Sequence, residues 1–131
     1  MSAGLLLVCH NDIGEVLIDT ACSLMEANPL NVRVVNVYRD SAPETIVEMA
    51  RTAVSEMDTG DGVLILTDLF GATPTNIATK LYGEHRVAII AGVNLPMLIR
   101  TLNYPSLDLD LLAEKAYSGG RDGIVMYKTE P

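Results

Sequence analysis

Short apolar runs alternate along this chain with stretches whose apolar residues recur at helical spacing. A short, uninterrupted apolar run is typical of a strand that is covered on both faces, as in a parallel sheet. The runs that predict strands are residues 3–9, 32–38, 63–67, 87–91 and 123–127. The stretches that predict helices are residues 13–27, 74–82 and 107–117, one that opens at 41–44, and a short one that ends near 102. This alternation indicates a three-layer, doubly wound α/β fold with a mostly parallel sheet and helices on both faces.

Several polar residues predict where these helices begin and end. Residues 41–44 (SAPE) have the pattern of a capping box with proline near the first turn. Thr73 followed by Pro74 predicts a second helix start, with the threonine as N-cap. The pairs at 28–29 (NP) and 119–120 (GG) are expected to end the first and the last helix.

Composition limits the classes of protein to which the chain can belong. With 131 residues, 49% of them hydrophobic, we expect residues 1–131 to form one domain with a sizeable core. Nine Lys and Arg against 17 Asp and Glu give a net charge of −8, which disfavours nucleic-acid binding and docking on anionic lipid. The same charge suits solubility or docking on a basic partner. Cys9 and Cys22 have the spacing of neither a disulfide scaffold nor a zinc site. We also expect no other metal and no cofactor.

The start of the chain and the length of its apolar runs bear on its location. No Lys- or Arg-led signal peptide precedes the first apolar run, and the longest runs are strand-sized. We therefore expect a cytoplasmic protein.

Two polar residues follow predicted strands directly. His10 comes after the first strand, and Asp68 comes after the strand at 63–67. Right-handed crossovers bring the carboxyl ends of parallel strands to one edge of the sheet, so the two side chains meet if these strands are neighbours. A carboxylate that accepts the Nδ1–H of an imidazole leaves Nε2 free as a nucleophile or base. His10 and Asp68 are therefore the candidate catalytic residues.

The segment after Asp68 supplies a candidate phosphate-binding site. Gly71 permits an unusual backbone turn, and the helix that starts at Thr73 would direct its first N–H groups toward the same edge. An imidazole, an orienting carboxylate and an anion site together favour phosphoryl transfer over hydrolysis. The sequence contains no serine triad, P-loop or GxGxxG motif.

Three further residues near the sheet edges receive other interpretations. His85 lies in a polar turn before a strand, at the opposite edge, and is expected to be a solvated turn residue. Cys9 is adjacent to His10, but neighbouring residues of a strand point to opposite faces, so we expect Cys9 to be buried. Met97 is expected to line a surface where a partner docks.

The residues above resemble the enzyme IIA domain of the mannose family of the bacterial phosphoenolpyruvate-dependent sugar phosphotransferase system. The resemblance covers residues 3–127 and is carried by His10 and the stretches LTDLFGATPTN (66–76) and AGVNLPML (91–98). It implies that His10 accepts a phosphoryl group from the histidine phosphocarrier protein HPr and passes it to a IIB protein, for sugar uptake or regulation. Asp68 matches the orienting carboxylate of the family.

The resemblance also implies further site residues and an assembly. Gly71 and Thr73 match the turn that holds the phosphoryl oxygens. The family forms a homodimer in which a C-terminal antiparallel edge strand, residues 123–127 here, crosses to the partner's sheet. Such a protein would meet the membrane only indirectly, through a permease complex. The chain ends soon after this strand, so a separate IIB protein is expected as acceptor.

The sequence departs from the family pattern at two places. Asn11 stands where glycine or another small residue is common, and Ala72-Thr73 replaces a frequent glycine-serine pair. Threonine keeps the hydroxyl of serine, so we expect little loss there.

Two other functions fit the same residues. The phosphotransferase subunit of dihydroxyacetone kinase has a similar IIA-like domain, and its acceptor would be a nucleotide-carrying kinase subunit. A regulatory binding module, controlled by its own phosphorylation state, belongs to a different class. A phospho-acceptor response regulator is disfavoured, because the first strand is followed by no pair of acids.

Overall fold

The computed structural model describes residues 2–26 and 31–130. Its strands are β1 (Gly4–His10), β2 (Val32–Val37), β3 (Val63–Thr67) and β4 (Val87–Ala91). Its helices are α1 (Ile13–Met25), α2 (Pro43–Met57), α3 (Thr73–Thr79), α4 (Leu95–Leu102) and α5 (Leu109–Asp122). The strands form one parallel sheet in the order β2-β1-β3-β4. The chain winds outward in both directions from the centre, so the point where the order reverses lies between β1 and β3.

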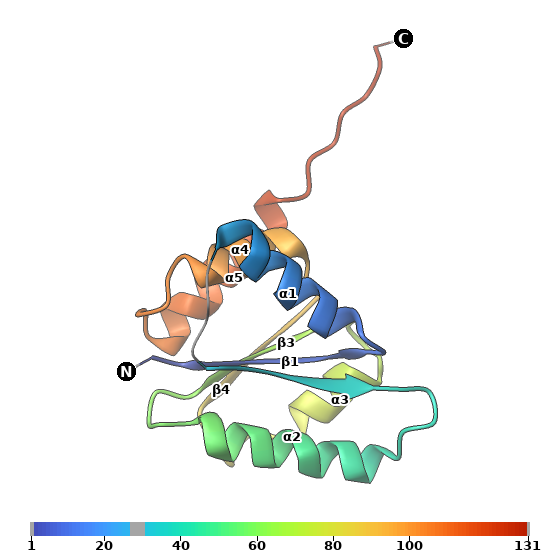
Figure 1. Ribbon diagram of the computed structural model, residues 1–131, viewed down its shortest axis with the longest axis vertical. Coiled ribbons are helices and arrows are strands. Elements are labelled where there is room, and N and C mark those ends of the chain that lie inside the picture. Colours follow the sequence, from blue (N-terminus) through green and yellow to red (C-terminus); the bar gives the residue numbers. More distant parts are fainter. Residues whose placement is uncertain (1, 27–30, 131) are drawn as a thin grey trace.

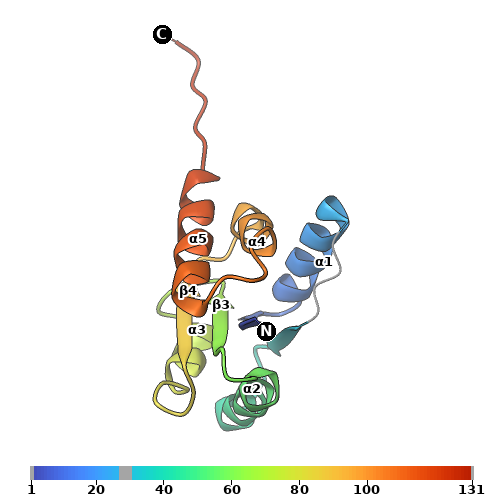
Figure 2. The same ribbon diagram turned by 90° about the vertical axis from the view of Figure 1, so that its left-hand side faces the viewer.

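The sheet lies between two layers of helices, as Figures 1 and 2 show. Helices α2 and α3 cover one face, and α1, α4 and α5 cover the other. Side chains along β1 alternate between the layers, because Leu6 and Val8 join the α2 core while Leu5, Leu7 and Cys9 join the α1 core. This arrangement confirms the predicted three-layer α/β fold. None of the helices in the described part of the chain is long and apolar enough to cross a membrane.

Two predicted helix caps are wrong. Helix α2 starts with Ala42 as N-cap and shows no side-chain capping bond, because the Ser41 hydroxyl instead accepts the N–H of Tyr38 at 3.0 Å. Helix α3 likewise has Ala72 as N-cap, and Thr73 is its first residue. The carbonyl of Ala72 already accepts the N–H of Asn76, which places the start of the helix one residue earlier than predicted.

The predicted helix ends also differ from the structure. Helix α1 ends at Met25, followed by Glu26 in the left-handed conformation, and the predicted stop at residues 28–29 lies outside the described residues. Helix α3 ends at Thr79, three residues before the expected position.

The glycine pair that was expected to end the last helix lies inside α5. A Cβ atom at Gly119 would lie 2.4 Å from Cβ of Arg100, and one at Gly120 would lie 2.7 Å from Cε of Met97. Both glycines therefore allow α5 to pack closely on α4, which is a tertiary requirement that local helix propensity does not reveal.

The C-terminal segment forms no strand within the single chain. Helix α5 continues to Asp122, and residues 124–130 then extend away from the body of the molecule (Figure 1). Met126 and Tyr127 are 77% and 93% exposed. The predicted strand at 123–127 is thus absent from this chain's own sheet, because no described strand lies beside it to accept its backbone hydrogen bonds. Its pairing with a second chain stays a prediction.

Candidate functional site

The last residue of β1 and the first residue after β3 meet at the carboxyl edge of the sheet. In the β1–β3 register Val8 lies opposite Thr67, which places Asp68 beside His10. Nδ1 of His10 lies 2.9 Å from Oδ2 and 3.1 Å from Oδ1 of Asp68. The backbone N–H of His10 also donates to Oδ2, at 2.9 Å. The contact predicted from the topology is confirmed.

This geometry favours one tautomer of the His10 imidazole. A carboxylate can only accept hydrogen bonds, so in the neutral imidazole of His10 it favours the tautomer with the proton on Nδ1 and the lone pair on Nε2. The Asp68 side chain is 11% exposed, whereas that of His10 is 37% exposed. The carboxylate is therefore shielded, while the imidazole ring is open enough for a protein partner to reach.

Two buried threonines hold the loop that carries Asp68. The Thr75 hydroxyl donates to the carbonyl of Leu69 at 2.8 Å and lies 2.7 Å from the hydroxyl of Thr67. Because the only hydroxyl proton of Thr75 is donated to the Leu69 carbonyl, the Thr67 hydroxyl donates to that of Thr75. The Thr67 carbonyl also accepts the N–H groups of Gly92 and Val93. Both the side chain and the carbonyl of Thr67, the residue before Asp68, are therefore fixed. Sequence reasoning missed this relay, because threonine in an apolar run has no distinctive pattern.

A cleft of about 480 Å³ opens beside His10. Its lining comes from the ends of β1 and β2 and from the starts of α2 and α3: His10, Asn11, Val37, Tyr38, Arg39, Ser41, Pro43, Ile46, Thr73 and Ile77. Thr73 therefore shares the cleft with His10. Gly71 lies on the neighbouring loop with φ of 82°, a left-handed value that favours glycine, so the predicted backbone turn is confirmed.

Comparison with known proteins places this chain in a family. The model of the family EIIA-man, described as "PTS system fructose IIA component", matches residues 4–115. This chain belongs to the EIIA-man family. PTS denotes the phosphotransferase system, so the chain is of the IIA type that sequence analysis suggested.

Individual relatives of the EIIA-man chain are distant and cover it to different extents. The mannose-specific EIIAB component of the PTS from Escherichia coli (strain K12) is 31% identical over 134 residues, covering 100% of this chain and 41% of its own length. The chain thus spans about two-fifths of that relative. The fructose-specific EIIA component of Bacillus subtilis (strain 168) is 34% identical over 74 residues, covering 56% of this chain and 51% of its own.

Solved structures agree on the fold. The mannose/sorbose specific IIA subunit from Enterococcus faecalis superposes with a TM-score of 0.86 at 22% identity, covering 100% of this chain and 98% of its own. The PTS component EIIA from Streptococcus agalactiae gives a TM-score of 0.82 at 22% identity, covering 95% and 96% of the two chains.

The backbone at Asn11 explains one departure of this EIIA-man chain from the pattern of the resemblance. Asn11 has φ of 50°, and its N–H donates to the carbonyl of Val37 at 2.9 Å. Glycine adopts this left-handed conformation most easily, and asparagine is among the few other residues that tolerate it. The turn after His10 is therefore kept without glycine.

Cys9 and Met97 are both buried in the EIIA-man chain. Burial, together with the charge of Asp68, raises the pKa of the Cys9 thiol to about 12, so Cys9 remains a neutral thiol at physiological pH, as expected for core packing. Met97 was expected at a docking surface, and that prediction is wrong. It packs under Gly120 because α5 covers it.

His85 is not the solvated turn residue that the sequence suggested. Its Nδ1 lies 2.8 Å from Oδ2 of Asp58, and its side chain is only partly exposed. Oδ1 of Asp58 accepts the N–H groups of Gly60 and Gly62 at 2.8 and 3.0 Å. This second histidine–aspartate pair lies at the opposite edge of the sheet, where it holds the turn before β3.

The Asp58 cluster predicts an acid-dependent loss of stability. The N–H of Gly60, followed by His85, holds the pKa of Asp58 below its ordinary value of 3.8. A lowered folded-state pKa stabilises the fold above 3.8, and this contribution is lost as the pH falls through the folded-state value. Asp58→Asn should therefore flatten the fall in the free energy of unfolding as the pH is lowered below 3.8, measured by urea denaturation. An unchanged pH slope would contradict this account.

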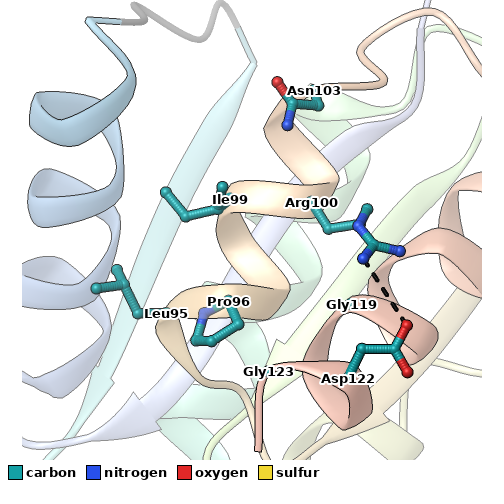
Figure 3. A pocket seen from close by; sticks show the side chains of 8 residues that line it. All are labelled: Leu95, Pro96, Ile99, Arg100, Asn103, Gly119, Asp122 and Gly123. Carbon is teal, nitrogen blue, oxygen red and sulfur yellow. Dashed lines mark ion pairs between the residues drawn. The ribbon is translucent and has the colours of Figure 1, made fainter. Parts of the chain in front are cut away.

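A second groove, of about 370 Å³, runs between α4 and α5 (Figure 3). It is lined by Leu95, Pro96, Ile99, Arg100, Asn103, Gly119, Asp122 and Gly123. Figure 3 shows Arg100 turned toward Asp122, with Nη2 and Oδ2 3.8 Å apart. Its lining includes no histidine, cysteine or hydroxyl side chain that could serve as a nucleophile, so chemistry is better supported at His10.

Proposed function

We propose that this chain is a phosphocarrier that accepts a phosphoryl group from phospho-HPr on His10 and passes it to a IIB protein, for sugar uptake or regulation. The observation that carries the proposal is the contact between Asp68 and Nδ1 of His10, which leaves Nε2 available at the edge of the sheet. Membership of a family of IIA components supports it, and so does the mannose-specific EIIAB relative.

The transfer begins with neutral His10. Its Nε2 attacks phosphorus in line, and a new N–P bond forms as the donor's bond to phosphorus breaks and the donor leaves with the electron pair. Positive charge builds on the imidazole, and the Asp68 carboxylate at Nδ1 stabilises it. Transfer to the acceptor is the reverse process, with His10 as the leaving group.

The phosphoryl oxygens require hydrogen-bond donors beside Nε2. Thr73 lines the cleft with His10, and the turn at Gly71 leads the chain into α3, whose first N–H groups have no acceptor within the helix. One preorganised donor of this kind is worth about 3 kcal/mol in comparable sites. Gly71 and Thr73 are therefore proposed as the phosphate-binding residues.

The charge of the chain favours a basic partner. The net charge is −8, and Asp12 and Glu15 lie in the first turns after His10. A partner with a basic face would be attracted to such a surface and would meet it faster at low salt. HPr as donor is proposed to dock in this way.

We also propose that the chain forms a homodimer through its C-terminal segment. Residues 124–127 are apolar and exposed, and among the described strands β4 pairs only with β3, which leaves its other edge open. Removal of residues 124–131 should convert a dimer into a monomer, because the pairing strand is lost. Removal of 128–131 alone is the matched control and should leave the dimer intact. Light scattering during size exclusion reports the mass, and a dimer that survives the longer truncation would contradict the swap.

The phosphocarrier role is tested by incubating the chain with phosphoenolpyruvate, enzyme I and HPr. We expect acid-labile, base-stable phosphate on the chain, and its loss when a IIB protein is added. Absence of label would reject the proposal. Transfer to a dihydroxyacetone kinase subunit, but not to IIB, would assign the chain to that alternative system.

A further inference from the structure

Arg39 lies in the cleft that contains the proposed nucleophile. Among the residues that line this cleft, all within the described part of the chain, Arg39 is the only lysine or arginine. It shares the lining with His10 and Thr73, which come from β1 and α3. Its position follows from the sheet, since Val37 is the β2 partner of His10 and Arg39 comes two residues later.

The backbone that carries Arg39 is held on both sides. The Ser41 N–H donates to the Tyr38 carbonyl at 3.0 Å, and the Tyr38 N–H donates to the Ser41 hydroxyl at 3.0 Å. The Tyr38 hydroxyl donates to the Asp12 carboxylate, which links this turn to the loop after His10. The Arg39 side chain therefore extends from a fixed turn, and its backbone is held in place relative to His10.

The guanidinium of Arg39 is available to a ligand. Within residues 2–26 and 31–130, it makes no ion pair and no hydrogen bond with another side chain. The remaining arginines are occupied by carboxylates or, for Arg121, by an aromatic ring: Arg33, Arg51, Arg86, Arg100 and Arg121. Arg39 is thus the exposed cation that the chain leaves unused beside its proposed site.

A cation beside His10 would offset the negative charge that a phosphoryl group brings to this site. The phosphoryl group brings about two negative charges to a site that already contains the Asp68 carboxylate, on a chain with a net charge of −8. Arginine presents a planar set of N–H donors that matches two phosphate oxygens at once. We propose that the Arg39 guanidinium binds the phosphoryl oxygens while the group is transferred to and from Nε2 of His10. This proposal rests on the phosphocarrier function proposed above.

The test compares Arg39→Gln with Arg33→Gln, which loses the same charge from β2 but near its amino end. Two donors are used: phospho-HPr, and phosphoramidate, whose P–N bond to ammonia breaks as the bond from Nε2 forms. Arg39→Gln should slow phosphorylation by both donors roughly 10- to 100-fold, as expected for a lost hydrogen bond to a charged group. Arg39→Lys should restore part of the rate, because lysine keeps the charge without the two-pronged geometry. Arg33→Gln should react like the wild type.

Each other outcome is decisive. Slowing with phospho-HPr alone would mean that Arg39 contacts the partner protein and not the phosphoryl group, which overturns the inference. Unchanged rates with both donors would overturn it as well. If the wild type accepts phosphate from neither donor, the phosphocarrier function itself fails. Urea denaturation of Arg39→Gln checks folding, and a change within about 0.5 kcal/mol is expected for this exposed position.

Discussion

His10→Ala is expected to abolish the acid-labile, base-stable phosphate that the chain acquires from phosphoenolpyruvate, enzyme I and HPr. Alanine removes Nε2, and the nearest other nucleophile is unsuitable, because the Cys9 thiol is buried with its pKa raised to about 12. The reaction is stopped with alkali, and the phosphate that remains bound to the protein is then quantified.

The matched control for this substitution is His85→Ala. His85 also donates toward an aspartate, with 2.8 Å between Nδ1 and the Asp58 carboxylate, but at the opposite edge of the sheet. The His85→Ala variant should take up phosphate as fully as the wild type. Label that persists in His10→Ala, or that disappears in His85→Ala, would show that the site is assigned to the wrong edge.

Asp68→Ala is expected to slow phosphorylation by about 10²- to 10⁴-fold, the range for losing a group that orients or assists a catalytic residue. Without the carboxylate, nothing holds the proton on Nδ1, and the His10 backbone N–H loses its acceptor as well. The label should still be on His10, because Asp68 positions the nucleophile without bonding to phosphorus.

Asp58→Ala provides the matched control for Asp68. It removes the same side chain from the other histidine–aspartate pair, so it should lower stability and leave the phosphorylation rate per folded molecule unchanged. Stopped-time labelling at several HPr concentrations separates a slower transfer step from weaker docking. A rate within a few-fold of wild type for Asp68→Ala would contradict the orienting role.

Much of this fold could be predicted from the sequence because its signals are local. The apolar runs at 63–67 and 87–91 coincide with β3 and β4, since a strand of a parallel sheet with helices on both faces is a nearly continuous apolar run. The meeting of His10 and Asp68 was also predictable, because parallel strands with right-handed crossovers bring their carboxyl ends to one edge. Neither inference needed the detailed packing of the domain.

Other features arise only when the segments of the chain pack together. The glycines at 119–120 resemble a helix end in sequence but lie inside α5, since α4 approaches too closely for a side chain. The pairing of His85 with Asp58 and the hydroxyl relay through Thr75 join segments whose individual sequences carry no sign of one another.

Chain order alone predicted β1 to β4, most of the helices and the two residues that follow the central strands, because periodicity and topology are properties of that order. The strand predicted at 123–127 is absent from the single chain. Which other side chains surround His10 became evident only in three dimensions. Arg39 follows an edge strand in an ordinary polar turn, and it becomes a candidate phosphate ligand because sheet register and a hydrogen-bonded turn bring it into the same cleft. Such proximity depends on side-chain packing in three dimensions, which no local pattern records.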